Sequence, residues 1–286
     1  MNKLILLLLP LAFAFASNKE AFIIKTKDGK TIEYSEMYAQ LAKADVIFFG
    51  ELHNNPIAHW LEYEVARDLY EDKKEALVLG AEMFEADNQI ILDEYLSGLI
   101  KENVFKEDCK LWPNYQTDYR PLVEYARENK IRFVATNIPR RYASMINSGG
   151  LKVLDELSQE ARQYVAPSPI VYDPDVSCYK NMTQTGMPGK MSAMVHLAEA
   201  QASKDATMAH FLYKNFKRGQ TFLHFNGSWH SDNHEGIVWY LRKANADLKI
   251  VVLTTIEAEN YASIKVEDLQ QADFTIVVPT TMTKTY

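Results

Sequence analysis

Short apolar runs, each followed by a polar residue and a helix signal, most constrain the fold of this 286-residue chain. In the first of them, the run from Val46 to Gly50 is followed by Glu51, His53 and then Pro56. Such a run is typical of a strand that is buried on both faces of a parallel sheet. Proline suits the first turn of a helix, because its missing N–H would be unpaired there anyway. The segment therefore predicts a strand, a loop that carries a carboxylate and an imidazole, and a helix.

The same alternation continues along the chain. Further apolar runs predict strands at residues 76–83, 131–136, 221–225, 249–255 and 274–279. Patterns typical of helices lie at residues 56–73, 87–99, 118–130, 191–216 and 237–244, whereas residues 168–190 show no period. Strands that alternate with helices predict an α/β fold with a largely parallel, doubly wound sheet flanked by helices.

The predicted core fold has two additions. Asp28-Gly29, between the strand-like runs 21–26 and 31–34, predicts an N-terminal β-hairpin. Ser35 is then expected to cap a short helix that ends near Leu41. Residues of about 150–217 are expected to form a helical insertion. Together, residues 17–286 are predicted to form a single α/β domain.

The N-terminus has the pattern of a secretory signal peptide. One lysine, an apolar run from Leu4 and the small residues Ala14 and Ala16 predict cleavage before Ser17, so that residues 1–16 are removed. The alternative is an uncleaved membrane anchor, but the apolar run is short for a bilayer. The sequence therefore predicts secretion across the inner membrane. Because no cysteine stands at the cleavage site, a lipid anchor is not expected.

Charge and cysteine content narrow the function classes. The net charge of -7 and the lack of a Lys/Arg cluster argue against a nucleic-acid partner. The two cysteines, Cys109 and Cys178, would lie outside the cytoplasm, where a disulfide is permitted. Either a disulfide between them or two free thiols is compatible with the sequence.

Polar side chains gather at the predicted strand ends. In a parallel sheet these ends share one edge, so the groups just past them become neighbours. The residues in these positions are Glu51, His53, Glu82, Asn137, Asn226 and His230. Two histidines and two carboxylates suit a divalent cation, and a bound water could then act as a nucleophile with Glu51 or Glu82 as base. Without a metal ion, the same groups would form a hydrogen-bonded polar cluster.

Other histidines are weaker candidates. His59 falls one turn into a predicted helix and His224 falls inside a strand, so both are expected to be structural.

Methionines offer a different signal, because five of the ten lie between Met182 and Met208. Such a flexible, polarisable surface suits an apolar ligand or a partner helix, although ordinary core filling explains it equally well.

Several motifs together resemble the ChaN-like haem-binding lipoproteins, whose superfamily also includes the Tiki proteases and erythromycin-esterase-like enzymes. In chain order the motifs are Gly50-Glu51-Leu52-His53, Leu79-Gly80-Ala81-Glu82-Met83-Phe84, Asp118-Tyr119-Arg120-Pro121, Asn137-Ile138-Pro139 and Gly227-Ser228-Trp229-His230. The resemblance implies a periplasmic or outer-membrane-associated haem and iron uptake protein of bacteria, with an outer-membrane receptor as a partner. It also implies a homodimer that holds haem as a face-to-face pair at its interface, with a tyrosinate on iron and a histidine assisting.

Two functions are compatible with these motifs. For haem binding, the candidate residues lie between Pro169 and Phe216 and are Tyr172, Tyr179, His196, His210 and Tyr213. A phenolate suits ferric iron, and a nearby histidine can favour its ionised form. The alternative is a metal-dependent hydrolase, with Glu51, His53, Glu82 and His230 as catalytic and metal-binding residues. Asn137, Asn226 and Arg120 would support that site.

Overall fold

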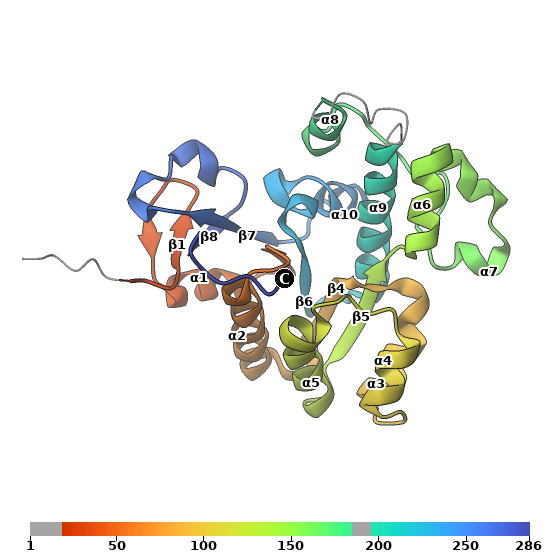
Figure 1. Ribbon diagram of the computed structural model, residues 1–286, viewed down its shortest axis with the longest axis horizontal. Helices are drawn as coiled ribbons and strands as arrows, with labels where there is room; N and C mark the ends of the chain where they lie inside the picture. The colour runs from red at the N-terminus through yellow and green to blue at the C-terminus, as the bar shows by residue number, and fades with distance from the viewer. Residues whose placement is uncertain (1–18, 185–195) are drawn as a thin grey trace, which may run out of the picture.

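The computed structural model describes residues 19–184 and 196–286 (Figure 1). The predicted signal peptide at residues 1–16 and three of the clustered methionines, Met187, Met191 and Met194, therefore lie outside the described residues. No helix in these two ranges combines the length and the apolar character needed to cross a membrane. The chain ends beside the sheet (Figure 1), where Thr285 N donates to the carbonyl oxygen of Asn54 at 3.0 Å.

One mixed sheet organises the described residues. Its eight strands have the order β2-β1-β8-β7-β3-β6-β4-β5. All neighbours from β8 to β5 are parallel, whereas β1 is antiparallel to both β2 and β8. The strands are β1 (Ile23–Thr26), β2 (Thr31–Ile32), β3 (Val46–Glu51), β4 (Leu77–Glu85), β5 (Arg132–Asn137), β6 (Thr221–Gly227), β7 (Ile250–Ala258) and β8 (Phe274–Pro279). The predicted parallel sheet and N-terminal hairpin are confirmed.

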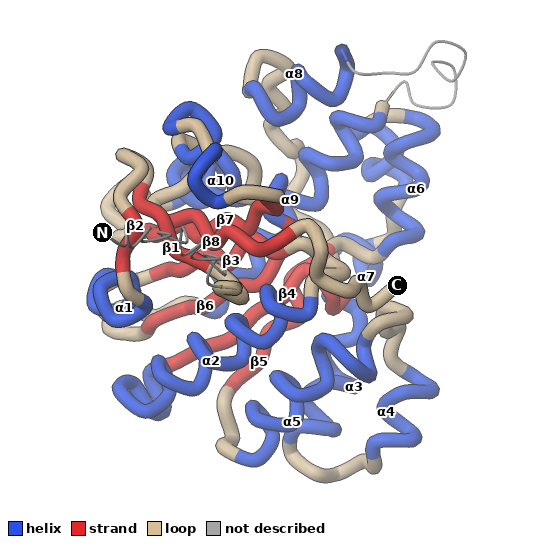
Figure 2. Tube along the Cα trace, turned by 60° about the vertical axis from the view of Figure 1, so that its left-hand side comes forward, coloured by secondary structure: helices blue, strands red, loops and turns tan. Residues whose placement is uncertain are grey.

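Helices cover both faces of the sheet (Figure 2). On one face lie α2 (Pro56–Lys73), α3 (Gln89–Leu96) and α5 (Arg120–Glu128), and on the other lie α9 (Leu197–Asn215) and α10 (Ile237–Ala244). Successive side chains of a strand point to opposite faces. Ile47 and Phe49 of β3 accordingly pack into one core and Val46 and Phe48 into the other, all fully buried. The prediction of a doubly wound sheet is therefore confirmed.

The remaining helices are peripheral. They are α1 (Tyr34–Leu41), α4 (Glu102–Asp108), α6 (Arg140–Gly149), α7 (Gln159–Arg162) and α8 (Ser177–Gln184). Helices α6 to α9 all lie between β5 and β6, in and before the stretch expected to be a helical insertion. The helix predicted from residue 191 is described only from Leu197 onward, as α9.

Three local expectations are resolved. Ser35 does not cap α1: Glu33 is the N-cap residue and forms a reciprocal capping box with Glu36. The aperiodic stretch 168–190 contains α8, a helix of only eight residues. Cys109 and Cys178 are free thiols in the structure, which therefore has no disulfide between them.

Candidate functional site

The first part of the site is formed by the end of β3 and the loop after it. Glu51 is the last residue of β3, and Asn55 caps α2 by accepting from the backbone N–H groups of Ile57 and Ala58. Glu51 is buried, and its Oε1 lies 2.6 Å from Nδ1 of His53 and accepts from the Tyr119 hydroxyl at 2.7 Å. Burial, and then the nearby charge of Glu62, raises the pKa of Glu51 to about 8.

Glu82 enters the site through an irregularity in β4. Pairing between β4 and β5 shifts register between Ala81 and Glu85, so that β4 does not end at Glu82 but continues past it. Such an irregularity redirects a side chain. The Gly227 N–H donates to Glu82 Oε2 at 2.8 Å, and Asn137 Nδ2 donates to the Glu82 carbonyl oxygen at 2.9 Å. The Gly227 N–H thus holds the Glu82 carboxylate against the end of β6.

His230 bridges two buried carboxylates. Its Nε2 lies 3.3 Å from Glu82 Oε1, and its Nδ1 is hydrogen-bonded to Asp205 of α9. Asp205 in turn accepts from the Tyr179 hydroxyl at 2.8 Å. Burial lowers the pKa of His230, but the charges of Glu82 and Asp205 outweigh it and raise that pKa to about 10. His230 is therefore an imidazolium at neutral pH, with both ring nitrogens engaged.

The four predicted catalytic residues form two neighbouring pairs. Gly227 lies between the pairs, because a Cβ atom on it would lie 2.8 Å from His53 Nε2 and 3.6 Å from Glu82 Oε2. Glu51 pairs with His53, and Glu82 pairs with His230. They do not form the single coordination sphere that the sequence predicts: in the described part of the chain, the one compact trio of metal-ligand side chains is Glu51, His59 and Glu62.

The predicted supporting residues have different positions. Asn137 lies in the site, as described above. Asn226 is buried below it and bonds to His224 Nδ1 and Ser231 Oγ, each at 3.0 Å. Arg120 does not join the site, because its guanidinium pairs with Glu102 at 2.6 Å. The supporting role predicted for Arg120 therefore finds no basis in its contacts.

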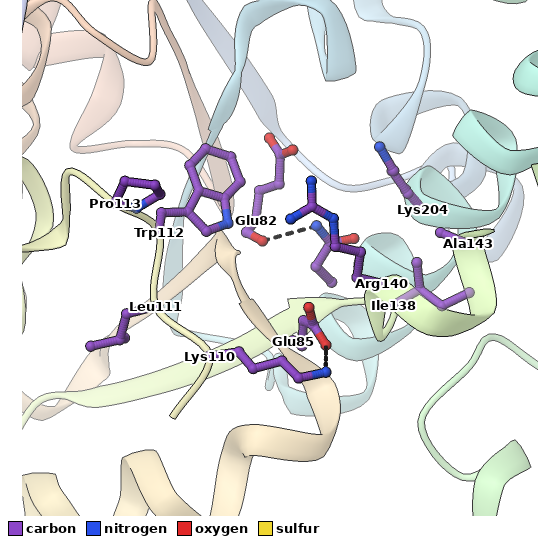
Figure 3. A pocket seen from close by; sticks show the side chains of 11 residues that line it. Glu82, Glu85, Lys110, Leu111, Trp112, Pro113, Ile138, Arg140, Ala143 and Lys204 are labelled. Atoms are coloured by element: carbon purple, nitrogen blue, oxygen red, sulfur yellow. Dashed lines mark hydrogen bonds and ion pairs between the residues drawn. The ribbon is translucent and has the colours of Figure 1, made fainter. Parts of the chain in front are cut away.

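A cavity of about 680 Å³ opens beside Glu82 (Figure 3). Trp112, Arg140 and Lys204 surround the Glu82 carboxylate in this view. The Trp112 ring also packs edge-on against His53, with 4.9 Å between the ring centroids. The cavity thus combines an aromatic wall, three cationic side chains and two carboxylates, and of these Lys110 pairs with Glu85 at 3.4 Å. A small anionic molecule with an apolar part would match it.

Sequence reasoning missed several of these residues. Asp205, Trp112 and Lys204 do not follow a predicted strand, so the strand-end argument could not find them. Arg140 does follow the predicted strand 131–136, but that argument named only Asn137 there. Tyr119 stands in a motif that the resemblance singles out. Asp205 carries one usable signal, because it is an acidic residue within the alanine-rich buried face of a helix. A charge in such a position needs a partner.

The five haem-ligand candidates lie in three environments. Tyr179 is fully buried, and burial and the charge of Asp205 raise the pKa of its phenol well above the ordinary value. Tyr172 packs against the Tyr179 ring, and His196 Nδ1 lies 2.6 Å from Glu199 Oε1. His210 and Tyr213 line a common hollow of about 300 Å³ on the outer side of α9.

Fold and site together define a mostly parallel α/β protein with a polar crevice at the carboxyl ends of its strands. The chain belongs to the family described as haem-binding uptake, Tiki superfamily, ChaN, whose model matches residues 37–241. The resemblance inferred from the motifs is therefore confirmed.

Solved structures share this fold. The chain is similar to ChaN of Campylobacter jejuni, whose structure is described as showing cofacial haem binding: the TM-score is 0.69, identity is 20%, and 91% of this chain and 98% of that chain are covered. A Bacillus cereus protein is similar with a TM-score of 0.53 and 9% identity, covering 85% of this chain and 90% of that one. At these identities the likeness shows the fold alone.

A plant protein matches part of the chain. Reticulata-related 5, a chloroplastic protein of Arabidopsis thaliana, is 26% identical over an alignment of 138 residues, and the match covers 46% of this chain. The chain spans only 18% of the length of that relative.

Proposed function

We propose that this protein binds haem in the hollow on the outer side of α9, with Tyr213 as the iron ligand and His210 beside it. The observation that carries the proposal is that these two side chains line the same hollow. Residues three apart on a helix share one face. Tyr213 is 40% exposed, so that its phenol is accessible to a ligand that enters from solvent.

The walls of the hollow suit a porphyrin. Apart from His210, Tyr213 and Tyr240, they are apolar or cationic: Ala166, Pro167, Pro169, Ile170, Val171, Ala206, Ala209, Lys243 and Ala244. Apolar walls can cover a porphyrin face, and Lys243 at the rim can pair with a propionate. Haem supplies the iron, and the protein supplies the anionic oxygen that a ferric ion prefers.

His210 can assist the phenolate. Burial, and then the charge of Lys214, lowers the pKa of His210, which keeps its imidazole neutral at pH 7. A neutral imidazole has a free lone pair that can accept the phenol proton. This arrangement would favour ionised Tyr213 when iron approaches.

The wider role that we propose is haem or iron uptake by a secreted protein. The apolar N-terminal run and membership of a haem-binding uptake family support it. A hollow of about 300 Å³ would leave one porphyrin face open, and a second copy of the chain could cover that face. Light scattering after size exclusion, with and without haemin, tests the dimer, and cell fractionation tests the location.

A haemin titration followed at the Soret band tests the proposed hollow. Wild-type protein should bind haemin saturably. Val171, which is 55% exposed at the hollow, offers a probe: Val171→Asp should weaken binding at least about 10-fold, or about 1.4 kcal/mol. Val266, 46% exposed and outside the hollow, gives the matched control, Val266→Asp. Equal affinity of both variants would place haem elsewhere.

A second candidate function is hydrolysis at the crevice, because a cavity of about 680 Å³ adjoins Glu82. Arg140 and Lys204 would hold an anionic substrate, and Glu82, which lines the cavity, would act as general base. Glu82→Gln should then lower turnover of a carboxylate-bearing ester or amide by about 100-fold or more. Lys30→Gln, at a surface lysine outside the cavity, serves as the control. Wild-type protein that turns over none of these substrates would remove this candidate.

A further inference from the structure

A buried cluster behind the crevice has no role in the proposed haem site. It consists of Glu51 at the end of β3 and of His59 and Glu62 in the first two turns of α2. These side chains are 1%, 6% and 1% exposed. We propose that Glu51, His59 and Glu62 form a binding site for a divalent transition-metal ion such as Zn²⁺. The site is independent of the haem hollow.

The separations within the cluster match a coordination sphere. His59 Nδ1 lies 3.0 Å from Glu62 Oε2 and 3.5 Å from Glu51 Oε2. Nitrogen and oxygen ligands bind Zn²⁺ at about 2.0–2.2 Å, which places neighbouring ligand atoms roughly 3.0–3.6 Å apart. The three side chains would therefore need little movement to bind an ion.

Two carboxylate oxygens in the cluster lack a hydrogen bond. They are Glu51 Oε2 and Glu62 Oε1, and both are inaccessible to solvent. Buried polar atoms are nearly always satisfied, because an unpaired one costs free energy. The other oxygen of Glu51 already accepts from Tyr119, so the unpaired oxygen is the one that faces His59. A cation between the three side chains would satisfy these atoms.

The orientation of His59 also favours a metal ion. Its Nε2 lies 3.1 Å from the carbonyl oxygen of His53, and this oxygen can only accept a hydrogen bond. Nε2 therefore donates to this carbonyl oxygen, which leaves Nδ1, on the side of Glu51 and Glu62, as the nitrogen that a metal ion would bind. Histidines that bind metals commonly donate their other ring N–H to a backbone carbonyl or a carboxylate in this way.

Charge balance points in the same direction. Besides the two glutamates, the buried Asp118 places its Oδ2 3.5 Å from His59 Nε2 and accepts from Asn114 at 2.6 Å. Three carboxyl groups thus surround one imidazole away from solvent. A divalent cation would hold the groups that it binds as carboxylates and would compensate their charge. The imidazole among the ligands favours a transition ion over Mg²⁺ or Ca²⁺.

Calorimetric titration of the metal-stripped full chain with Zn²⁺ tests the proposal. Wild-type protein should bind one equivalent. His59→Ala and Glu62→Gln should each weaken binding by more than the roughly 10- to 100-fold loss typical of an outer-shell partner. His234, which also pairs with a carboxylate, gives the matched control, His234→Ala. The proposal would be overturned if both cluster variants bound Zn²⁺ with wild-type affinity, or if the wild-type protein bound no Zn²⁺.

X-ray absorption at the zinc edge of the wild type adds a test that needs no variant. The proposed site supplies one imidazole, whereas a site at the crevice would supply two, from His53 and His230. A spectrum fitted by one imidazole and oxygen ligands supports the proposal. Two imidazoles would contradict it, even if the cluster variants failed to fold.

Discussion

Asp205 accepts a hydrogen bond from Nδ1 of His230, and both side chains are buried. The pair joins the middle of α9 to the short helix that follows β6, Ser228–His230. Because Glu82 lies on the other side of the ring, the imidazolium is held between two carboxylates. This charged row links the long helix to the sheet edge at which the candidate site lies.

The charged row of Asp205, His230 and Glu82 makes the free energy of unfolding depend on pH. His230 has a pKa of about 10 in the folded chain, against an ordinary value of 6.5. Its contribution to the free energy of unfolding is therefore complete below about pH 6.5 and is lost as the pH rises through 10. Asp205→Asn should lower that free energy by about 3–5 kcal/mol at pH 6, and by less at pH 10.

Urea unfolding at both pH values measures this effect. Asp175, which pairs with Lys180 at 3.6 Å on the surface, provides the control. Asp175→Asn should change the free energy of unfolding by less than about 1 kcal/mol. If Asp205→Asn lowered the free energy of unfolding equally at pH 6 and pH 10, His230 would not be ionised in the folded protein.

A glycine next to this row predicts a second stability difference. Gly236 has φ +56°, and a Cβ atom there would lie 2.3 Å from the carbonyl oxygen of His230. Gly219, with φ +91°, has open space around the same position. Gly219→Ala should cost about 1–2 kcal/mol for the backbone conformation alone. Gly236→Ala should cost at least about 1 kcal/mol more, because backbone must also shift. Thermal melts of the two variants check this order.

The fold could be predicted because buried parallel strands have a clear pattern. The run from Val46 to Phe49 is fully buried on both faces, and Pro56 begins α2 as expected. Local details depend on finer chemistry. Glu33, rather than Ser35, caps α1, because a reciprocal pair of glutamates replaces the hydroxyl cap. The helix α8 has only eight residues, which are too few to establish a periodic pattern in the sequence.

The candidate site was predictable only where it follows strands. Glu51 and Glu82 come directly from β3 and β4, and so they could be named from the sequence. Asp205 and Glu62 lie on helices, and their roles depend on which helical face packs inward. His59 was expected to be structural. Its Nδ1 nevertheless lies 3.5 Å from Glu51 and 3.0 Å from Glu62, and each of these glutamates has one oxygen without a hydrogen bond. Helix packing, which sequence alone leaves open, determines these contacts.

Helix packing also distinguishes the two candidate tyrosines Tyr179 and Tyr213. Tyr179 and Tyr213 are both helical, and composition gives no ground to rank them. In the structure Tyr179 is fully buried against Asp205, whereas Tyr213 is 40% exposed in an apolar hollow. Of these two tyrosines, we therefore expect Tyr213 and not Tyr179 to reach a haem iron.

The central claim is that Tyr213 binds ferric haem, and the absorption and resonance Raman spectra of the haemin complex test it most directly. Wild-type protein should show the charge-transfer and phenolate bands of an iron tyrosinate. Tyr213→Phe should lose these bands, whereas Tyr261→Phe, at a tyrosine outside the hollow, should keep them. Tyrosinate bands that persist in Tyr213→Phe, or that are absent from the wild-type complex, would contradict the account.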